Sequence, residues 1–230
     1  MLAMPEYKVP SFETSEIEIT NALSKLKRHG LNIKLPESLV KKFEATTLFD
    51  GDDGLFKELI KLAQIYFEYG CGKSTEFVFK YSNATIFSVD TSNDWVRKIK
   101  SLEGFESSDR LNISWVDVGD VSDWGYPTTF QMRHNFKKYA ELLWFNNQIP
   151  DLVLIDGRFR VYSFLTSVKF APIGTKILFD DYTIRPFYHV IEEFCPKLDT
   201  CGRQALFEIS GTAKQKISDD IIHSFKNVIA

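Results

Sequence analysis

The feature that most constrains this chain is an alternation of short apolar runs with amphipathic segments over roughly 130 residues. The apolar runs are rich in β-branched or aromatic residues and are apolar on both faces, which is typical of strands buried between two helical layers. Alternating strands and helices need right-handed crossovers, so the pattern predicts a Rossmann-like, doubly wound and mostly parallel α/β sheet. The expected strands lie at 65–69, 85–90, 112–117, 151–156 and 176–180.

The amphipathic segments predict the helices that cover this sheet, at 75–81, 94–102, 136–145, 161–170 and 186–194. In the tail, the runs 197–201 and 204–209 flank Gly202-Arg203 and predict a closing antiparallel hairpin, with a last helix at 217–229. The N-terminal part has helical periodicity without strand runs, as in Ile19, Leu23 and Leu26. We therefore divide the chain into an N-terminal helical extension, residues 1–63, and a Rossmann-like domain, residues 64–230.

Composition limits the classes of partner. Lys and Arg number 28 against 31 Asp and Glu, a formal charge of −3, which disfavours a general nucleic-acid partner. The cysteines, Cys71, Cys195 and Cys201, form no CxxC pair, which argues against a disulfide framework and a zinc site. No apolar run has the length of a membrane span, and residues 1–10 lack the apolar core of a signal peptide. We expect a soluble, cytoplasmic protein without a membrane partner.

The loop after the first expected strand reads Glu68-Tyr69-Gly70-Cys71-Gly72-Lys73-Ser74-Thr75. A phosphate-binding P-loop needs its first glycine at the place of Phe67, and a dinucleotide fingerprint needs its third glycine at the place of Thr75. The better match is acid-x-Gly-x-Gly followed by an acidic strand end, since Asp90 stands 20 residues after Gly70. This pattern predicts a site for S-adenosylmethionine, which has no phosphates and needs a close backbone approach to its methionine part.

Each acid in this pattern has a specific expected role. Asp90 accepts both ribose hydroxyls, and Glu68 holds the methionine ammonium directly or through water. Each signal also has a plain structural alternative, in which Gly-x-Gly is a tight turn and Asp90 caps a helix. Their order on a predicted doubly wound sheet favours the cofactor.

These residues resemble the class I S-adenosylmethionine-dependent methyltransferases, especially small bacterial proteins with a loop of the type E-Y-G-x-G-x-S-T. Three further blocks match, at 86–90, 151–157 and 176–182, the last resembling an H-D-Y strand end with Asp180 in place of the His. The resemblance spans about residues 64–209. It implies a cofactor site lined by Glu68, Gly70, Cys71, Gly72, Asp90, Asp117 and Val118, with Asp120 as a competing choice near the adenine.

Asp156-Gly157-Arg158 and Asp180-Asp181-Tyr182 place polar groups after two apolar strands, and we take Asp156, Asp181 and Arg158 as candidate catalytic residues. In one interpretation the acids hold a divalent cation, as in catechol-type O-methyltransferases. That family carries Asp-Asn where this chain has Asp181-Tyr182, so a metal is not favoured. In the other, Asp156 or Asp181 acts as a base or orienting group, and Arg158 and Arg160 bind an acidic acceptor. The structural alternative is that these acids cap helices.

The expected activity is methyl transfer to a small-molecule acceptor, at oxygen. Two alternatives stay open: a Rossmann-like protein that binds the S-adenosyl ligand without turnover, and a nucleotide-dependent phosphotransferase that uses Gly72-Lys73-Ser74. The insert that contains Trp124, Tyr126 and 136–144 is rich in aromatic residues, and three interpretations of it stay open. Its aromatic side chains could line the bottom of an acceptor pocket, form a homodimer surface, or be buried in the core. No acceptor motif is readable, so the sequence does not identify the acceptor.

Overall fold

The structure, a computed structural model, describes residues 47–49, 51–106 and 108–229. The Ile19, Leu23 and Leu26 pattern lies outside these ranges, so the N-terminal helical extension stays a prediction. Within the described ranges, no helix has the length and apolarity that a bilayer crossing requires.

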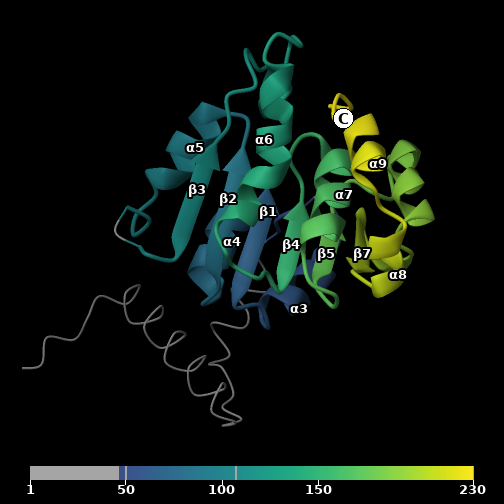
Figure 1. The fold of residues 1–230 in the computed structure, drawn as a ribbon. Coiled ribbons are helices and arrows are strands. Elements are labelled where there is room, and N and C mark those ends of the chain that lie inside the picture. The colour runs from purple at the N-terminus through teal and green to yellow at the C-terminus, as the bar shows by residue number, and fades with distance from the viewer. Residues whose placement is uncertain (1–46, 50, 107, 230) are drawn as a thin grey trace, which may run out of the picture.

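The described residues form one seven-stranded sheet in the order β3-β2-β1-β4-β5-β7-β6 (Figure 1). Strands β1 to β5 run parallel where they pair, whereas β7 is antiparallel to both β5 and β6. The predicted doubly wound sheet and its closing hairpin are therefore confirmed. The strands are β1 (Ile65–Tyr69), β2 (Thr85–Asp90), β3 (Leu111–Trp115), β4 (Leu152–Ile155), β5 (Lys176–Phe179), β6 (Lys197–Cys201) and β7 (Gln204–Glu208).

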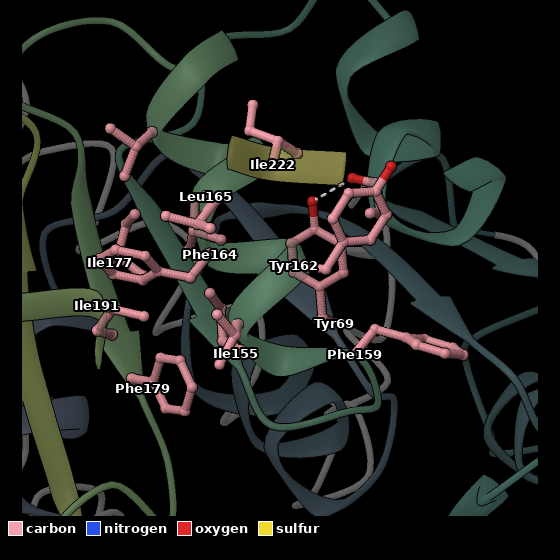
Figure 2. Close-up of a cluster of buried hydrophobic side chains, with 14 of the residues drawn as sticks. Tyr69, Ile155, Phe159, Tyr162, Phe164, Leu165, Ile177, Phe179, Ile191 and Ile222 are labelled. Atoms are coloured by element: carbon pink, nitrogen blue, oxygen red, sulfur yellow. Dashed lines mark hydrogen bonds between the residues drawn. The ribbon is translucent and has the colours of Figure 1, made fainter. Parts of the chain in front are cut away.

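Two helical layers explain why the central strands are apolar on both faces. Helices α6 (Phe136–Glu141), α7 (Arg160–Phe170), α8 (Gly211–Gln215) and α9 (Asp219–Ser224) contribute to a core on one face, and α3 (Gly54–Ile60) and α4 (Lys73–Tyr81) to a core on the other. Figure 2 shows part of the larger core, where Ile155 and Phe179 from the sheet lie near Phe164 and Leu165 from α7. Helix α5 (Asn93–Lys100) covers a smaller cluster beside β3.

Several expected helices differ in type or length. The segment predicted at 186–194 is a 3₁₀-helix, η4 (Pro186–Glu193). The one predicted at 136–145 begins as α6 and continues into a 3₁₀ turn, η3 (Leu142–Phe145). The last helix, predicted at 217–229, is wrong in extent, because α9 covers only Asp219–Ser224; the short helix α8 that precedes it was not predicted. Serine side chains begin both: Ser210 accepts from the N–H of Ala213, and Ser218 from the N–H of Ile221.

The aromatic insert divides between the core and the surface. Phe136, Tyr139 and Leu143 are buried in the larger core, whereas Trp124 and Tyr126 are exposed. The buried alternative therefore holds for the helical part of the insert. The homodimer alternative stays a prediction.

Candidate active site

The glycine loop lies where the carboxyl ends of β1 and β4 meet. Gly70 has φ +94°, and a Cβ built on it would lie 2.7 Å from the Cα of Gly157 in the loop after β4. A Cβ on Gly157 would in turn lie 2.1 Å from the hydroxyl oxygen of Tyr139. Both glycines are therefore required by contacts within the protein, and Gly70 would be needed even without a ligand.

Gly72 differs from Gly70 because a side chain added at Gly72 would point into open space. Its φ of 176° is ordinary extended backbone, and no heavy atom of the described residues lies within 4 Å of a Cβ built there. Its N–H donates to the Thr75 hydroxyl at 2.9 Å, so the loop turns directly into α4. This open side is the part of the loop that a ligand can approach closely.

Asp90 ties the glycine loop to the end of β2. Its Oδ2 accepts from the N–H of Cys71 at 2.8 Å, and its Oδ1 accepts from the N–H of Ser92 at 2.6 Å. The helix that follows is capped by Ser92, which accepts from the N–H of Trp95, so Asp90 is not its N-cap. Burial raises the pKa of Asp90, and the two backbone N–H groups oppose that shift. Each carboxylate oxygen keeps a further lone pair for a ribose hydroxyl.

Glu68 lies beneath the loop and points into the protein. Its side chain is buried and accepts hydrogen bonds from four hydroxyls: Tyr66 at 2.9 Å, Ser74, Thr75 at 2.5 Å and Ser88 at 3.2 Å. Ser74 and Thr75 are in the first turn of α4, so Glu68 fixes that turn to β1. This arrangement supports the loop from below and leaves no exposed carboxylate oxygen for a direct contact with a ligand ammonium.

Glu68 also gives the protein a pH-dependent stability. Burial raises the pKa of Glu68 to about 7, against the opposing effect of its hydroxyl partners. The pKa of Glu68 is higher in the folded than in the unfolded protein. The contribution of Glu68 to the unfolding free energy is therefore fully present below the unfolded pKa of about 4.5, and it is lost as the pH rises through about 7. Relative to a Glu68→Gln variant, which does not titrate, we expect the wild type to lose about 3 kcal/mol of unfolding free energy over that range. Urea denaturation of both proteins between pH 5 and 8 measures the difference, and a constant difference would contradict the assignment.

Cys71, Val118 and Asp117 are also expected to bind the cofactor, and their side chains differ in burial. The Cys71 side chain packs with Val96 and Ile99 under α5, and burial raises the pKa of its thiol. Val118 is fully buried in the larger core, whereas Asp117 is exposed and accepts from the N–H of Gly119. Of these three, only Asp117 presents its side chain to solvent.

The acids after β4 and β5 meet in one cluster. Ligand atoms of Asp156, Asp180 and Asp181 lie within 4.8 Å of one another. Arg160, from the start of α7, approaches Asp156 and Asp181, each at 3.1 Å. Arg203 approaches Asp180 at 2.7 Å and Asp181 at 3.3 Å, and Arg185 approaches Asp181 at 2.9 Å. Three carboxylates are thus paired with three guanidinium groups.

This pairing does not fit a divalent cation. Every carboxylate that could hold the ion already faces a guanidinium, and Arg160 also donates to the carbonyl oxygens of Gly157 and Asp180. A cation placed among these acids would be repelled by three fixed positive charges. The cluster therefore works as an ion-pair network, and we derive no metal chemistry from it.

Within the cluster, Asp156 and Asp181 differ in access. The side chain of Asp156 is 28% exposed, whereas that of Asp181 is 7% exposed and contacts all three arginines. Asp181 also has a left-handed backbone, φ 60°, at the end of its strand. Burial raises the pKa of Asp156 well above its ordinary value, and the negative charge of Asp180 raises it further, while Arg160 opposes the shift. Asp156 is therefore the acid of the two that a hydroxyl group from outside can approach.

Arg158 follows Asp156 by two residues and is partly buried. Its backbone N–H donates to the hydroxyl of Tyr139 at 3.2 Å, and burial lowers the pKa of its guanidinium. Its Nε is buried and has no hydrogen-bond partner among the described residues. Arg160, in contrast, is saturated by its acidic and carbonyl partners, so of these two arginines it is Arg158 that keeps a buried donor without a partner among the described residues.

The partners that organise this site are residues that the sequence patterns did not predict. These are the hydroxyls around Glu68 and the two arginines Arg185 and Arg203. One of these partners had a signal in the sequence: Tyr66 and Glu68 are two residues apart on a strand, so their side chains lie on the same face. The structure adds Ser88, which is the register partner of Glu68 on β2. The arginines carried no such signal, because they reach the acids from segments that only the fold brings together.

The sheet, the glycine loop after β1 and the acid at the end of β2 define the fold of class I S-adenosylmethionine-dependent methyltransferases, as the resemblance implied. The chain is similar to a methyltransferase-like protein from Silicibacter pomeroyi, with 26% identity and a TM-score of 0.61 over 78% of this chain and 88% of that one. An O-methyltransferase from Bacillus cereus, solved with S-adenosylhomocysteine, has 14% identity and a TM-score of 0.46 over 85% of this chain and 91% of that one. No protein-family model and no curated protein matches the chain.

Proposed function

We propose that the protein transfers a methyl group from S-adenosylmethionine to an oxygen of a small acceptor that carries an acidic group. The observation that carries the proposal is the convergence of Gly72, Asp90 and Asp156 at one edge of the sheet, with the open side of Gly72 as the approach for the ligand. In an open α/β sheet, ligands bind at this edge, where the strand order reverses.

Each residue of the site has a separate role in the proposed reaction. Gly72 admits the methionine part, and the carboxylate of Asp90 accepts from the ribose hydroxyls, held in place by its bonds to Cys71 and Ser92. The bound cofactor supplies an electrophilic methyl group on a sulfonium. Asp156 accepts the proton of the acceptor hydroxyl, and Arg158 binds the acidic group of the acceptor and so aligns it. Asp181 is a positioning residue, because it holds Arg160 against Asp156.

The structure disfavours the phosphotransferase alternative. A P-loop serine must turn its hydroxyl outward to a magnesium ion, whereas Ser74 donates its hydroxyl to the buried Glu68. Phe67, at the place of the first P-loop glycine, is a buried strand residue that packs against Phe87 and Trp144. The loop is therefore too short and too tightly anchored to wrap a triphosphate.

Gly72→Val tests the cofactor site with little cost to folding. The extended backbone of Gly72 accepts a side chain, but the added methyl groups would fill the space that the ligand needs. We expect the affinity for S-adenosylhomocysteine to fall at least about tenfold, a loss of roughly 1.4 kcal/mol, while the melting temperature stays close to that of the wild type. Calorimetric titration measures the affinity.

Gly211→Val is the matched control, since Gly211 begins α8 and a Cβ there would make only an ordinary contact with Ile173 at 3.7 Å. This variant should bind as the wild type does. ATP binding without S-adenosylhomocysteine binding would overturn the cofactor assignment. Formation of S-adenosylhomocysteine with a panel of hydroxylated organic acids separates an enzyme from a protein that binds the ligand without turnover.

A further inference from the structure

The loop between β4 and α7 carries Asp156 and Arg158, and one residue of its backbone is strained. Phe159, directly after Arg158, has φ 54°, a left-handed conformation that a bulky residue rarely adopts. Its side chain is fully buried in the larger core, which Figure 2 shows together with Tyr162. A residue keeps such a conformation only when contacts from the surrounding structure hold it there.

One of these contacts comes from α6. The hydroxyl oxygen of Tyr139 accepts from the N–H of Arg158 at 3.2 Å. The same oxygen would lie 2.1 Å from a Cβ built on Gly157, so it occupies the space that a side chain at Gly157 would need. Tyr139 is fully buried, and its ring lies 5.5 Å from that of Phe159, measured between centroids. Helix α6 therefore holds the loop by a hydrogen bond and a ring contact.

A second contact comes from the segment that follows α9. The N–H of Phe159 donates to the carbonyl oxygen of Ile229 at 3.1 Å. Ile229 is itself buried and belongs to the same core as Phe159. Helices α6 and α9 flank α7 (Figure 1), so the two contacts reach the start of α7 from different neighbours. Two consecutive N–H groups of the loop are thus held by two elements that are distant in sequence.

Together the two contacts set the direction of the Arg158 side chain. Peptide groups are planar, so fixing the N–H groups of Arg158 and Phe159 fixes the two peptide planes on either side of the Arg158 Cα. The buried Nε of Arg158 has no hydrogen-bond partner among the described residues, so no such bond at Nε orients the side chain. We propose that Tyr139 and Ile229 are positioning residues, which hold the backbone of Arg158 so that its guanidinium meets the acidic group of the acceptor. This inference rests on the proposed function, in which Arg158 binds that group.

Tyr139→Phe tests the first contact, because it removes one oxygen atom and keeps the ring. The substrates are each hydroxylated acid that the wild type methylates and the methyl ester of that acid. We expect the ratio of kcat/KM for the acid to kcat/KM for the ester to fall roughly 2- to 10-fold, as for the loss of one hydrogen bond. A loss of stability alone would lower both values together and leave the ratio unchanged. Tyr162→Phe is the matched control, since Tyr162 is buried in the same core and its hydroxyl has no hydrogen-bond partner among the described residues.

A double-mutant cycle shows whether Tyr139 acts through Arg158. In an Arg158→Gln background, Tyr139→Phe should not lower the ratio further, because no guanidinium is left to position. A further fall of the same size would overturn the proposal. Ile229→Ala should lower the ratio as Tyr139→Phe does, Ile229→Val should restore most of it, and Val228→Ala, a change at an exposed neighbour, should leave it unchanged. An unchanged ratio in Tyr139→Phe or in Ile229→Ala would overturn the role of that residue.

Amide hydrogen exchange, followed by NMR, tests the two contacts without turnover. The N–H of Arg158 should exchange faster in Tyr139→Phe, and the N–H of Phe159 faster in Ile229→Ala, whereas Tyr162→Phe should change neither. Unchanged exchange in both variants would overturn the two contacts. If the wild type forms no S-adenosylhomocysteine with any acid of the panel, the proposed function fails and the role of Arg158 fails with it. The exchange rates would then still show whether Tyr139 and Ile229 hold the loop, so the two failures are distinguishable.

Discussion

Replacing Asp156 with asparagine is expected to reduce the rate of methyl transfer by roughly 10²- to 10⁴-fold, the usual contribution of a positioned general base. Asn has the same shape but cannot accept a proton, and Asp156 is the more accessible acid of its cluster. The affinity for S-adenosylhomocysteine should stay close to that of the wild type. Single-turnover kinetics with a reactive acceptor measures the loss, and Asp199→Asn, an exposed change on β6, is the control.

The pH profile separates a base from a residue that only holds geometry. Burial and the charge of Asp180 raise the pKa of Asp156, so the deprotonated form that accepts a proton increases as the pH rises. The wild-type rate should therefore rise through that raised pKa, and the Asp156→Asn rate should not follow it. Because the arginines already neutralise the acids, a chelator should leave the wild-type rate unchanged. Turnover by Asp156→Asn at the wild-type rate would rule out the role.

Replacing Asp181 with asparagine is expected to lower the free energy of unfolding by roughly 3–5 kcal/mol, the range for breaking a buried ion pair from one side. Asp181 contacts three guanidinium groups, and Arg160, one of them, is only 3% exposed. The variant leaves these positive charges near one another with less compensation, and desolvation then opposes folding. Urea denaturation at pH 7 gives the unfolding free energy.

Asp219→Asn is the matched control, because Asp219 pairs with Lys169 on the surface. The same chemical change there should leave the free energy of unfolding nearly unchanged, since solvent screens an exposed pair. Removing one of the opposing cations should recover part of the loss, so Asp181→Asn combined with Arg185→Gln should be more stable than Asp181→Asn alone. Equal losses for Asp181→Asn and Asp219→Asn would show that the cluster is not a buried network.

The sequence was sufficient for the central sheet because the physical signal there is local. A strand buried on both faces must be apolar throughout, so the runs around Tyr66, Ile86 and Leu154 marked β1, β2 and β4 within a residue or two of their bounds. Strand ends in such a sheet gather at one edge, so the glycine loop, Asp90 and Asp156 could be expected at the same edge before any contact was known. The helices at 186–194 and 217–229 were less accurate, because packing and serine caps decide where short helices begin and end.

The side-chain environments at the site were not predictable from the sequence. Glu68 matched a cofactor-binding acid in the motif, yet its orientation is set by four hydroxyls from β1, α4 and β2, and these turn it inward. Asp156 and Asp181 were equivalent as sequence signals. They become different only because Arg160, Arg185 and Arg203 approach from separate segments and bury one acid more than the other.

The sequence by itself determined the fold class, the edge of the sheet where the parallel strands end and the place of the glycine loop at that edge. Hydrophobic periodicity and glycine spacing depend on neighbouring residues, so they can be read along the chain. The tertiary structure decided which carboxylates are exposed, which are paired and which residues hold the loop after β4. Those properties depend on charges and hydrogen-bonding groups that are distant in sequence, and a shifted pKa or a hydrogen bond exists only once folding has brought its partners together.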